Sequence, residues 1–153
     1  MDFASLTLEI GEVATLTLDR PEKRNALALD VMLEITAALR AIAETDATGV
    51  VLAANGPVFS AGHNFGDMAG ATLDQARHLF EVCTEMMDTV QSIPQVVIAR
   101  VHALATAAGC QLVATCDLAV AAQDQCIGLD ADGAQHRDRV LRGLGLLDRK
   151  SVV

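Results

Sequence analysis

The sequence is poor in aromatic side chains, with four phenylalanines and neither tryptophan nor tyrosine among its 153 residues. Its hydrophobic fraction is nevertheless 52%, so small and aliphatic side chains must form most of the core. A charged fraction of only 20% excludes the composition of an intrinsically disordered chain. The length is that of a single domain.

Basic residues are also scarce, with 11 Lys and Arg against 20 Asp and Glu and a net charge of −9. Proteins that bind nucleic acids or anionic membranes need basic surface, so we expect neither partner. No run of about 18 apolar residues, the length that spans a membrane as a helix, occurs. Residues 1–11 carry acids and no basic residue, unlike a signal or transit peptide, so the default expectation is a cytoplasmic protein.

The cysteines and histidines do not have the spacing of metal ligands. The four cysteines, at 83, 110, 116 and 126, include no CxxC pair, and the four histidines are scattered. We therefore expect reduced thiols and no metal site.

Hydrophobic periodicity predicts alternating strands and helices. Residues 5–10 and 13–19 have the alternation of a β-hairpin, and residues 29–45 have the period of an amphipathic helix. A second helix is expected from Thr72 or Asp74 to about Ser92. Three short apolar runs predict buried strands, at 49–53, 96–101 and 117–121. Residues 54–71 are expected to be a loop, and residues 105–116 a loop leading into a short helix. This order indicates an α/β fold with parallel crossover connections.

The composition changes after about Asp124. Five of the 11 Lys and Arg residues fall in the last 29 positions, and no sustained apolar stripe is present there. We expect a folded domain over residues 1–124 and an unrelated, aberrant or disordered tail over residues 125–153.

Two loops rich in small residues, 57–65 and 105–111, each follow a predicted buried strand. Small side chains allow backbone N–H groups to approach a ligand, and a helix N-terminus adds unpaired donors. A plain strand-to-helix connection and a closely packed helix are the alternatives for the two loops. Together they can place two N–H groups around one carbonyl oxygen, the geometry of an oxyanion hole.

A basic cluster lies at Arg20, Lys23 and Arg24, which are three of the six Lys and Arg residues before residue 125. In an acidic chain such a cluster suits an anionic group such as phosphate. The alternative is a solvated turn whose charges offset the acidic surface.

Residues 16–27, 49–65 and 97–117, in this order, resemble the crotonase superfamily of enoyl-CoA hydratases and isomerases. The resemblance implies a ββα superhelix and assembly into homotrimers or hexamers. It also implies an acyl-CoA thioester as ligand, with coenzyme A as part of the substrate and no separate cofactor.

The resemblance places the two oxyanion-hole donors on the backbone of His63 and Ala108. Family members usually have Ala or Gly at the first position and Gly at the second, so the bulk of His63 would narrow the site. The coenzyme A contacts that the resemblance implies are Arg24, Ala26, Ala61, Asn64 and Phe65.

The chain departs from hydratases at both catalytic glutamates. Gln111 stands at the first position, and a glutamine can orient water but cannot act as a general base. Residues 124–130 do not match the segment that carries the second, and family chains are longer. We therefore expect a truncated N-terminal half with impaired hydration, and leave open whether it is an enzyme. The alternatives are a non-catalytic acyl-CoA binder or oligomer partner, and an inactive fragment.

Overall fold

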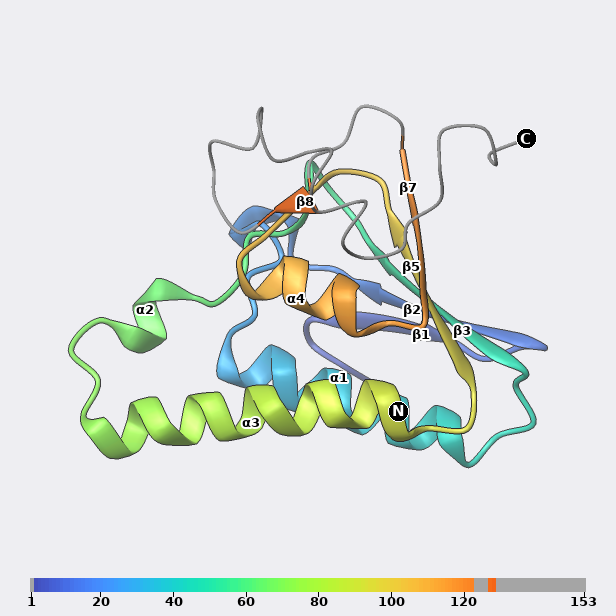
Figure 1. Cartoon of the computed structure of the whole chain (residues 1–153), viewed down its shortest axis with the longest axis horizontal. Coiled ribbons are helices and arrows are strands. Elements are labelled where there is room, and N and C mark those ends of the chain that lie inside the picture. Colours follow the sequence, from blue (N-terminus) through green and yellow to red (C-terminus); the bar gives the residue numbers. More distant parts are fainter. Residues whose placement is uncertain (1, 123–126, 129–153) are drawn as a thin grey trace.

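The computed structural model describes residues 2–122 and 127–128, which form two β-sheets and the helices that cover them (Figure 1). The larger sheet has the strand order β1-β2-β3-β5-β7. Its strands are β1 (Leu6–Glu9), β2 (Val13–Leu18), β3 (Gly49–Ala54), β5 (Val96–Val101) and β7 (Leu118–Ala121). The smaller sheet has the order β4-β6-β8, with β4 (Val58–Ser60), β6 (Leu104–Thr106) and β8 (Ile127–Gly128).

The hairpin and the parallel crossovers expected from the sequence are confirmed. Strands β1 and β2 pair antiparallel, with Leu8 opposite Leu16. Strands β2, β3, β5 and β7 pair in parallel, because a helical segment returns the chain to the same end before β3, β5 and β7.

The helical elements are η1 (Pro21–Lys23), α1 (Leu29–Ala43), α2 (Phe65–Met68), α3 (Leu73–Ser92) and α4 (Ala108–Thr115). Helix α3 begins where the sequence indicated. The Thr72 hydroxyl accepts a hydrogen bond from the Gln75 amide at 3.3 Å, and the Gln75 side chain accepts one from the Thr72 amide at 2.8 Å. This reciprocal cap satisfies two N–H groups that the first helical turn cannot.

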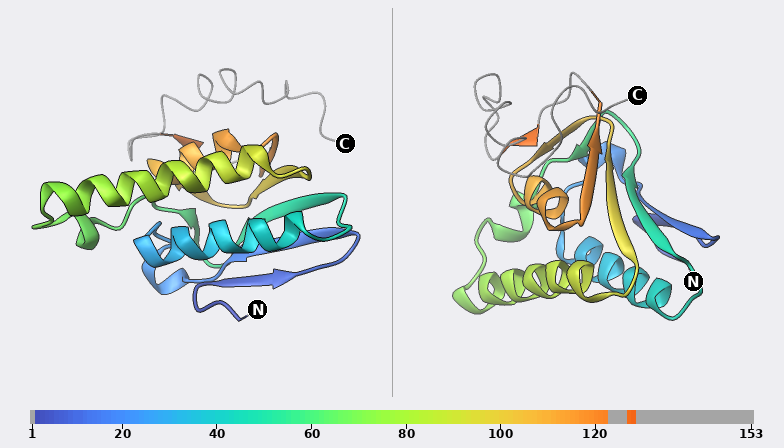
Figure 2. Two further views of the ribbon diagram at one scale, coloured as in Figure 1. Left: turned by 90° about the horizontal axis from the view of Figure 1, so that it is seen from below. Right: turned by 45° about the vertical axis from the view of Figure 1, so that its right-hand side comes forward.

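Helices α1 and α3 lie side by side, as both views in Figure 2 show. An ion pair between Arg40 and Glu85, 2.7 Å apart, joins them at the surface. Their apolar faces are buried against the sheet in one continuous core, which includes Ile35 and Leu39 of α1 and Leu16 and Leu52 of the sheet. Within the described residues, no helix combines the length and the hydropathy that a membrane-spanning segment needs.

The expectation of a loop over residues 54–71 is wrong in part. This segment contains β4 and α2, and β4 pairs in parallel with β6 to begin the smaller sheet. Three-residue strands are too short to show a hydrophobic period, so this sheet gave no signal in the sequence. The expected tail, residues 125–153, lies outside the described residues apart from Ile127 and Gly128, which form β8 beside β6.

Candidate functional site

The two loops rich in small residues touch each other at one end of the smaller sheet. A Cβ atom on Gly62 would lie 2.8 Å from Cβ of Ala107 and 3.0 Å from the backbone nitrogen of Ala108. Gly62 also has φ +83°, a conformation that side chains with a Cβ rarely adopt. Glycine is therefore required twice over at this position, by the backbone angle and by the contact.

Ser60 is the buried centre of this end of the sheet. Its hydroxyl donates to the carbonyl oxygen of Asn25 at 2.9 Å and accepts from the Gly62 amide at 3.2 Å. Gly109 of α4 lies against it, so that an added Cβ would be 2.7 Å from three Ser60 atoms. Ser60 thus holds together three segments that are far apart in the sequence.

Asn25 fixes the basic segment to the first loop. Its side-chain nitrogen donates to the carbonyl oxygens of Asn55 and Val58, both at 2.8 Å, and its side-chain oxygen accepts from the Arg20 amide at 2.9 Å. Asn25 is 2% exposed and has φ 48°, which asparagine tolerates better than most residues. Sequence reasoning did not assign it a role; the available signal was one asparagine within a charged turn.

The backbone amides of His63 and Ala108, which are the two sequence-predicted donors, are both unpaired within the described part of the chain. His63 lies opposite Leu27 in a parallel bridge, but its own amide does not take part in the two hydrogen bonds. The Leu27 amide donates to the carbonyl oxygen of Gly62, and the Asn64 amide donates to the carbonyl oxygen of Leu27. Ala108 is the first residue of α4, so its N–H has no acceptor within the helix. Two unpaired donors therefore lie on touching segments.

The backbone is strained beside the second donor. Ala107 has φ 50° and ψ −127°, a region that glycine occupies far more readily than alanine. The positive φ falls on the residue directly before the second donor. Strain of this kind costs about 1–3 kcal/mol and persists where the surrounding packing imposes it.

A cavity of about 350 Å³ lies between η1, the start of α1 and the first loop. Ala26 and Asn64, two of the predicted coenzyme A contacts, line it together with Lys23. The other three predicted contacts are not among its lining residues. Arg24 and Ala61 are instead joined by a backbone hydrogen bond of 3.1 Å, and Phe65 is 81% exposed at the start of α2.

The cavity is lined by two cations, Arg20 and Lys23, and by two carboxylates, Asp30 and Asp67. Arg20 is neutralised by Asp30 at 3.0 Å and lies 3.9 Å from Glu22. Neither Lys23 nor Arg24 forms an ion pair with another described residue, and both are exposed. In a chain with a net charge of −9, these two side chains remain available for an anion.

The imidazole ring of His63 points toward α3. It meets the ring of Phe80 edge-on, with 5.6 Å between centroids and 86° between planes. Its Nδ1 atom is buried and has no hydrogen-bond partner among the described residues. The sequence indicated only that this side chain would narrow the site; its ring contact and its unpartnered nitrogen had no signal there.

Gln111 lies in the first turn of α4, and its amide donates to Ala107 at 3.1 Å. Its exposed side chain makes no hydrogen bond within the described residues. The described residues contain no group of three or more His, Cys, Asp or Glu side chains that could hold a metal ion.

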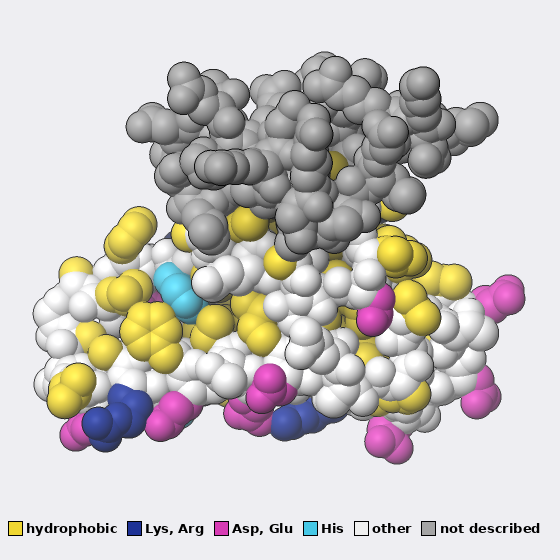
Figure 3. Space-filling view, viewed as in Figure 1, with side chains coloured by type: hydrophobic (Ala, Val, Ile, Leu, Met, Phe, Trp, Pro, Cys, Tyr) yellow, Lys and Arg dark blue, Asp and Glu magenta, His cyan; other side chains and the backbone are white. Residues whose placement is uncertain are grey.

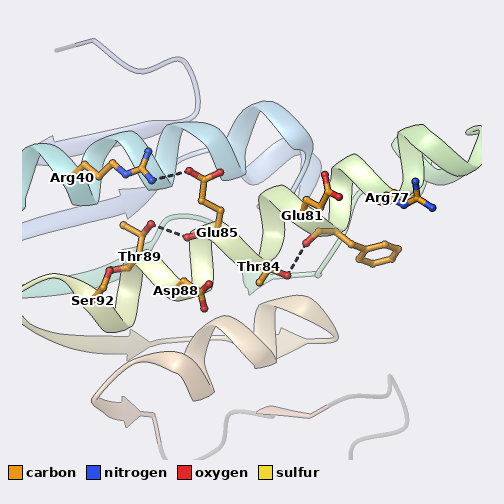
Figure 4. Close-up of a pocket in the computed structure, with 9 residues that line it drawn as sticks. Arg40, Arg77, Glu81, Thr84, Glu85, Asp88, Thr89 and Ser92 are labelled. Carbon is orange, nitrogen blue, oxygen red and sulfur yellow. Dashed lines mark hydrogen bonds and ion pairs between the residues drawn. The ribbon is translucent and has the colours of Figure 1, made fainter.

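A larger open cavity of about 720 Å³ lies along the outer face of α3 (Figure 4). The Arg40–Glu85 ion pair crosses it, and Phe80 lines it near the start of the helix. None of the sequence-predicted site residues lines this cavity, so it is distinct from the junction of the two loops.

Comparison with known proteins identifies the relatives of this arrangement. The family model described as enoyl-CoA hydratase/isomerase matches residues 9–132. Enoyl-CoA hydratase domain-containing protein 3, mitochondrial, from Danio rerio is 45% identical over 130 residues, covering 80% of this chain and 44% of its own length. The human protein of the same name is 38% identical over 118 residues. The sequence of residues 56–63 also resembles this branch of the family. The chain thus spans less than half the length of these curated relatives.

Solved structures of family members have a similar fold over the matched residues. An enoyl-CoA hydratase from Mycobacterium smegmatis superimposes with a TM-score of 0.77 and 45% identity, covering 79% of this chain and 49% of that one. Human enoyl coenzyme A hydratase domain-containing protein 3 superimposes with a TM-score of 0.73 and 35% identity over the same shares. The expected crotonase-like fold is confirmed for the matched part.

Proposed function

Because the chain belongs to the enoyl-CoA hydratase/isomerase family, we propose that it binds acyl-CoA thioesters at the junction of its two small-residue loops. The observation that carries the proposal is the pair of unpaired amides of His63 and Ala108 on touching segments. Two fixed N–H donors suit a thioester oxygen, and more so the enolate oxygen that forms when a proton leaves the neighbouring carbon.

The nucleotide end of coenzyme A is proposed to enter the cavity beside Lys23. Asn64 lines this cavity and directly follows His63, so one short segment would contact both ends of the ligand. The unneutralised charges of Lys23 and Arg24 suit its phosphates, although electrostatic contacts this exposed contribute modestly.

The chemistry supported by the described residues is binding and polarisation of the thioester, with little hydration. Gln111, at the position of a hydratase glutamate, can hold a water molecule through its amide but cannot remove a proton from it. This same observation favours the second candidate, a non-catalytic acyl-CoA binder.

Equilibrium binding of coenzyme A and butyryl-CoA to the 153-residue chain tests the proposal, with crotonyl-CoA absorbance followed in parallel for turnover. We expect measurable binding, tighter for the ester, and hydration close to background. Failure of both ligands to bind a folded chain would refute the site. Rapid hydration would refute the impairment and the non-catalytic alternative together.

Ala108→Pro sharpens the test because proline lacks the N–H and is otherwise tolerated at the first position of a helix. We expect it to weaken butyryl-CoA binding while leaving that of free coenzyme A nearly unchanged. Ala108→Gly, which keeps the N–H, is the matched control. Equal losses in both variants would mean that packing, and not the donor, matters at this position.

A further inference from the structure

The imidazole of His63 has a hydrogen-bonding atom for which the described chain provides no partner. Nδ1 is buried and unpaired, although the great majority of buried side-chain polar atoms in proteins have a partner. The edge-on contact with Phe80 occupies the ring but satisfies no nitrogen. A ligand that brings a polar group to this atom would therefore complete the site.

The direction of the ring follows from the backbone. His63 and Asn64 lie in an extended segment paired to Leu27, and successive side chains of such a segment point to opposite sides. Asn64 lines the cavity beside Lys23, where the nucleotide is proposed to bind. The His63 ring is therefore on the other side, against α3, where the acyl group would lie.

The surroundings of the ring suit an acyl chain. Four large hydrophobic residues of the segment 65–80 are substantially exposed: Phe65 at 81%, Met68 at 37%, Leu73 at 75% and Phe80 at 48%. Figure 3 shows hydrophobic side chains gathered around a histidine on the face between α2, α3 and α4. Of these four residues, Phe80 contacts the His63 ring directly.

We propose that His63 selects acyl-CoA esters whose short acyl group carries an oxygen substituent, either a hydroxyl or a carboxylate, close to the thioester. This inference rests on the proposed function. The same residue would then act twice, since its amide would hold the thioester oxygen and its Nδ1 atom would bind the substituent a few bonds away. A substituted ester gains a hydrogen bond to Nδ1 that an unsubstituted chain cannot form, so the site prefers the substituted ester.

The test compares dissociation constants of the 153-residue chain for butyryl-CoA, 3-hydroxybutyryl-CoA and succinyl-CoA, with free coenzyme A as reference. We expect at least one substituted ester to bind about fivefold or more tightly than butyryl-CoA. Tighter binding of 3-hydroxybutyryl-CoA would show that the site binds a hydroxyl substituent, and tighter binding of succinyl-CoA would show that it binds a carboxylate. Equal affinity for all three esters overturns the inference and leaves the proposed function standing, whereas no binding of any coenzyme A compound overturns both.

Two substitutions assign the preference to the imidazole. His63→Phe keeps a ring against Phe80 and removes the nitrogens, so the preference should disappear. His63→Asn places an amide near the position of Nδ1 and should restore part of it. Both variants keep the backbone N–H, and the ratio of two affinities within one variant is independent of how much protein is folded. A preference that survives in His63→Phe would show that another group provides it.

Discussion

Ser60 on β4 and Gly109 on α4 lie so close together that no side chain fits on the glycine. A Cβ there would be 2.7 Å from the carbonyl oxygen, Cβ and Oγ of Ser60. Ser60 cannot withdraw, because its strand pairs with β6 and its hydroxyl bonds to Asn25. This contact sets the distance between the start of α4 and the first loop, and therefore between the two proposed donors.

Gly109→Ala should lower the free energy of unfolding by about 1–3 kcal/mol, since overpacking forces the backbone of α4 or β4 to move. Urea denaturation followed by circular dichroism measures this. Gly11→Ala is the matched control, because its Cβ would lie 3.5 Å from the Val13 oxygen, an ordinary contact. A loss no larger at Gly109 than at Gly11 would contradict the close contact.

Asn25→Ala should destabilise the chain by about 2–4 kcal/mol, because three buried or half-buried backbone groups lose their partner. Asn25→Asp keeps the acceptor for the Arg20 amide but faces the oxygens of Asn55 and Val58 with a carboxylate, so we expect a loss at neutral pH that acid reduces. Thermal melts at two pH values measure both. An Asn25→Asp variant as stable as the original chain would show that the two donated hydrogen bonds contribute little.

Ala107→Gly should raise the free energy of unfolding by about 1 kcal/mol, because glycine adopts the observed φ and ψ without strain. Ala69→Gly is the control, because Ala69 has φ −67° and its backbone carries no strain that glycine could relieve. Glycine at position 69 should therefore be neutral or destabilising. Chemical denaturation measures the free energy of unfolding of both variants. A destabilised Ala107→Gly would mean that the methyl group of Ala107 contributes more through packing than its strain costs.

Lys23→Glu should weaken binding of butyryl-CoA at least about threefold at low salt, and the effect should shrink as salt is added. Lys23 lines the cavity proposed for the nucleotide, whereas Arg24 does not, so Arg24→Glu should have the smaller effect. Isothermal titration measures both. If neither substitution weakens binding, the nucleotide does not lie at this cluster.

Cys116 should be inert to alkylation under conditions that modify ordinary thiols. Burial, and secondarily the charge of Asp117, raises the pKa of the Cys116 thiol from 9.0 to about 12. At pH 9 the thiolate is then about a thousandth of the total, and only the thiolate is the nucleophile. Iodoacetamide labelling with peptide mapping separates Cys116 from the other cysteines. Fast labelling of Cys116 in the folded chain would contradict the raised pKa.

The same shift gives a direction to the pH dependence of stability. Because the pKa of Cys116 is higher in the folded chain than in the unfolded one, its contribution is complete below pH 9 and is lost as the pH rises toward about 12. Burial raises the pKa of Cys83 in the same direction. Cys116→Ala should make the free energy of unfolding fall less steeply over this range.

Elements that carry their own local signal could be predicted from the sequence. Helix α3 combines an apolar stripe with the Thr72–Gln75 cap, and β5 is a continuous apolar run. Strands β4 and β6 have three residues each and are stabilised by pairing with each other, so no local sequence pattern predicts them.

The candidate site was predictable only as separate pieces. Resemblance selected His63 and Ala108, and the structure places their segments in contact through Gly62. The role of Asn25, the strain at Ala107 and the orientation of the His63 ring all arise from residues distant in the sequence. Periodicity and composition cannot encode such contacts, because each depends on how two loops meet after the core has formed.

The register of the larger sheet has a consequence for how fast the chain folds. The hairpin β1–β2 closes a short turn, but Val13 pairs with Gly49, and Gly49 in turn pairs with Val96. Each parallel pairing closes a long loop of chain, and the entropy of that closure is lost before any contact compensates for it. We expect the hairpin to form early, and the docking of β5 on β3 to limit the folding rate, so that the proposed site is assembled last.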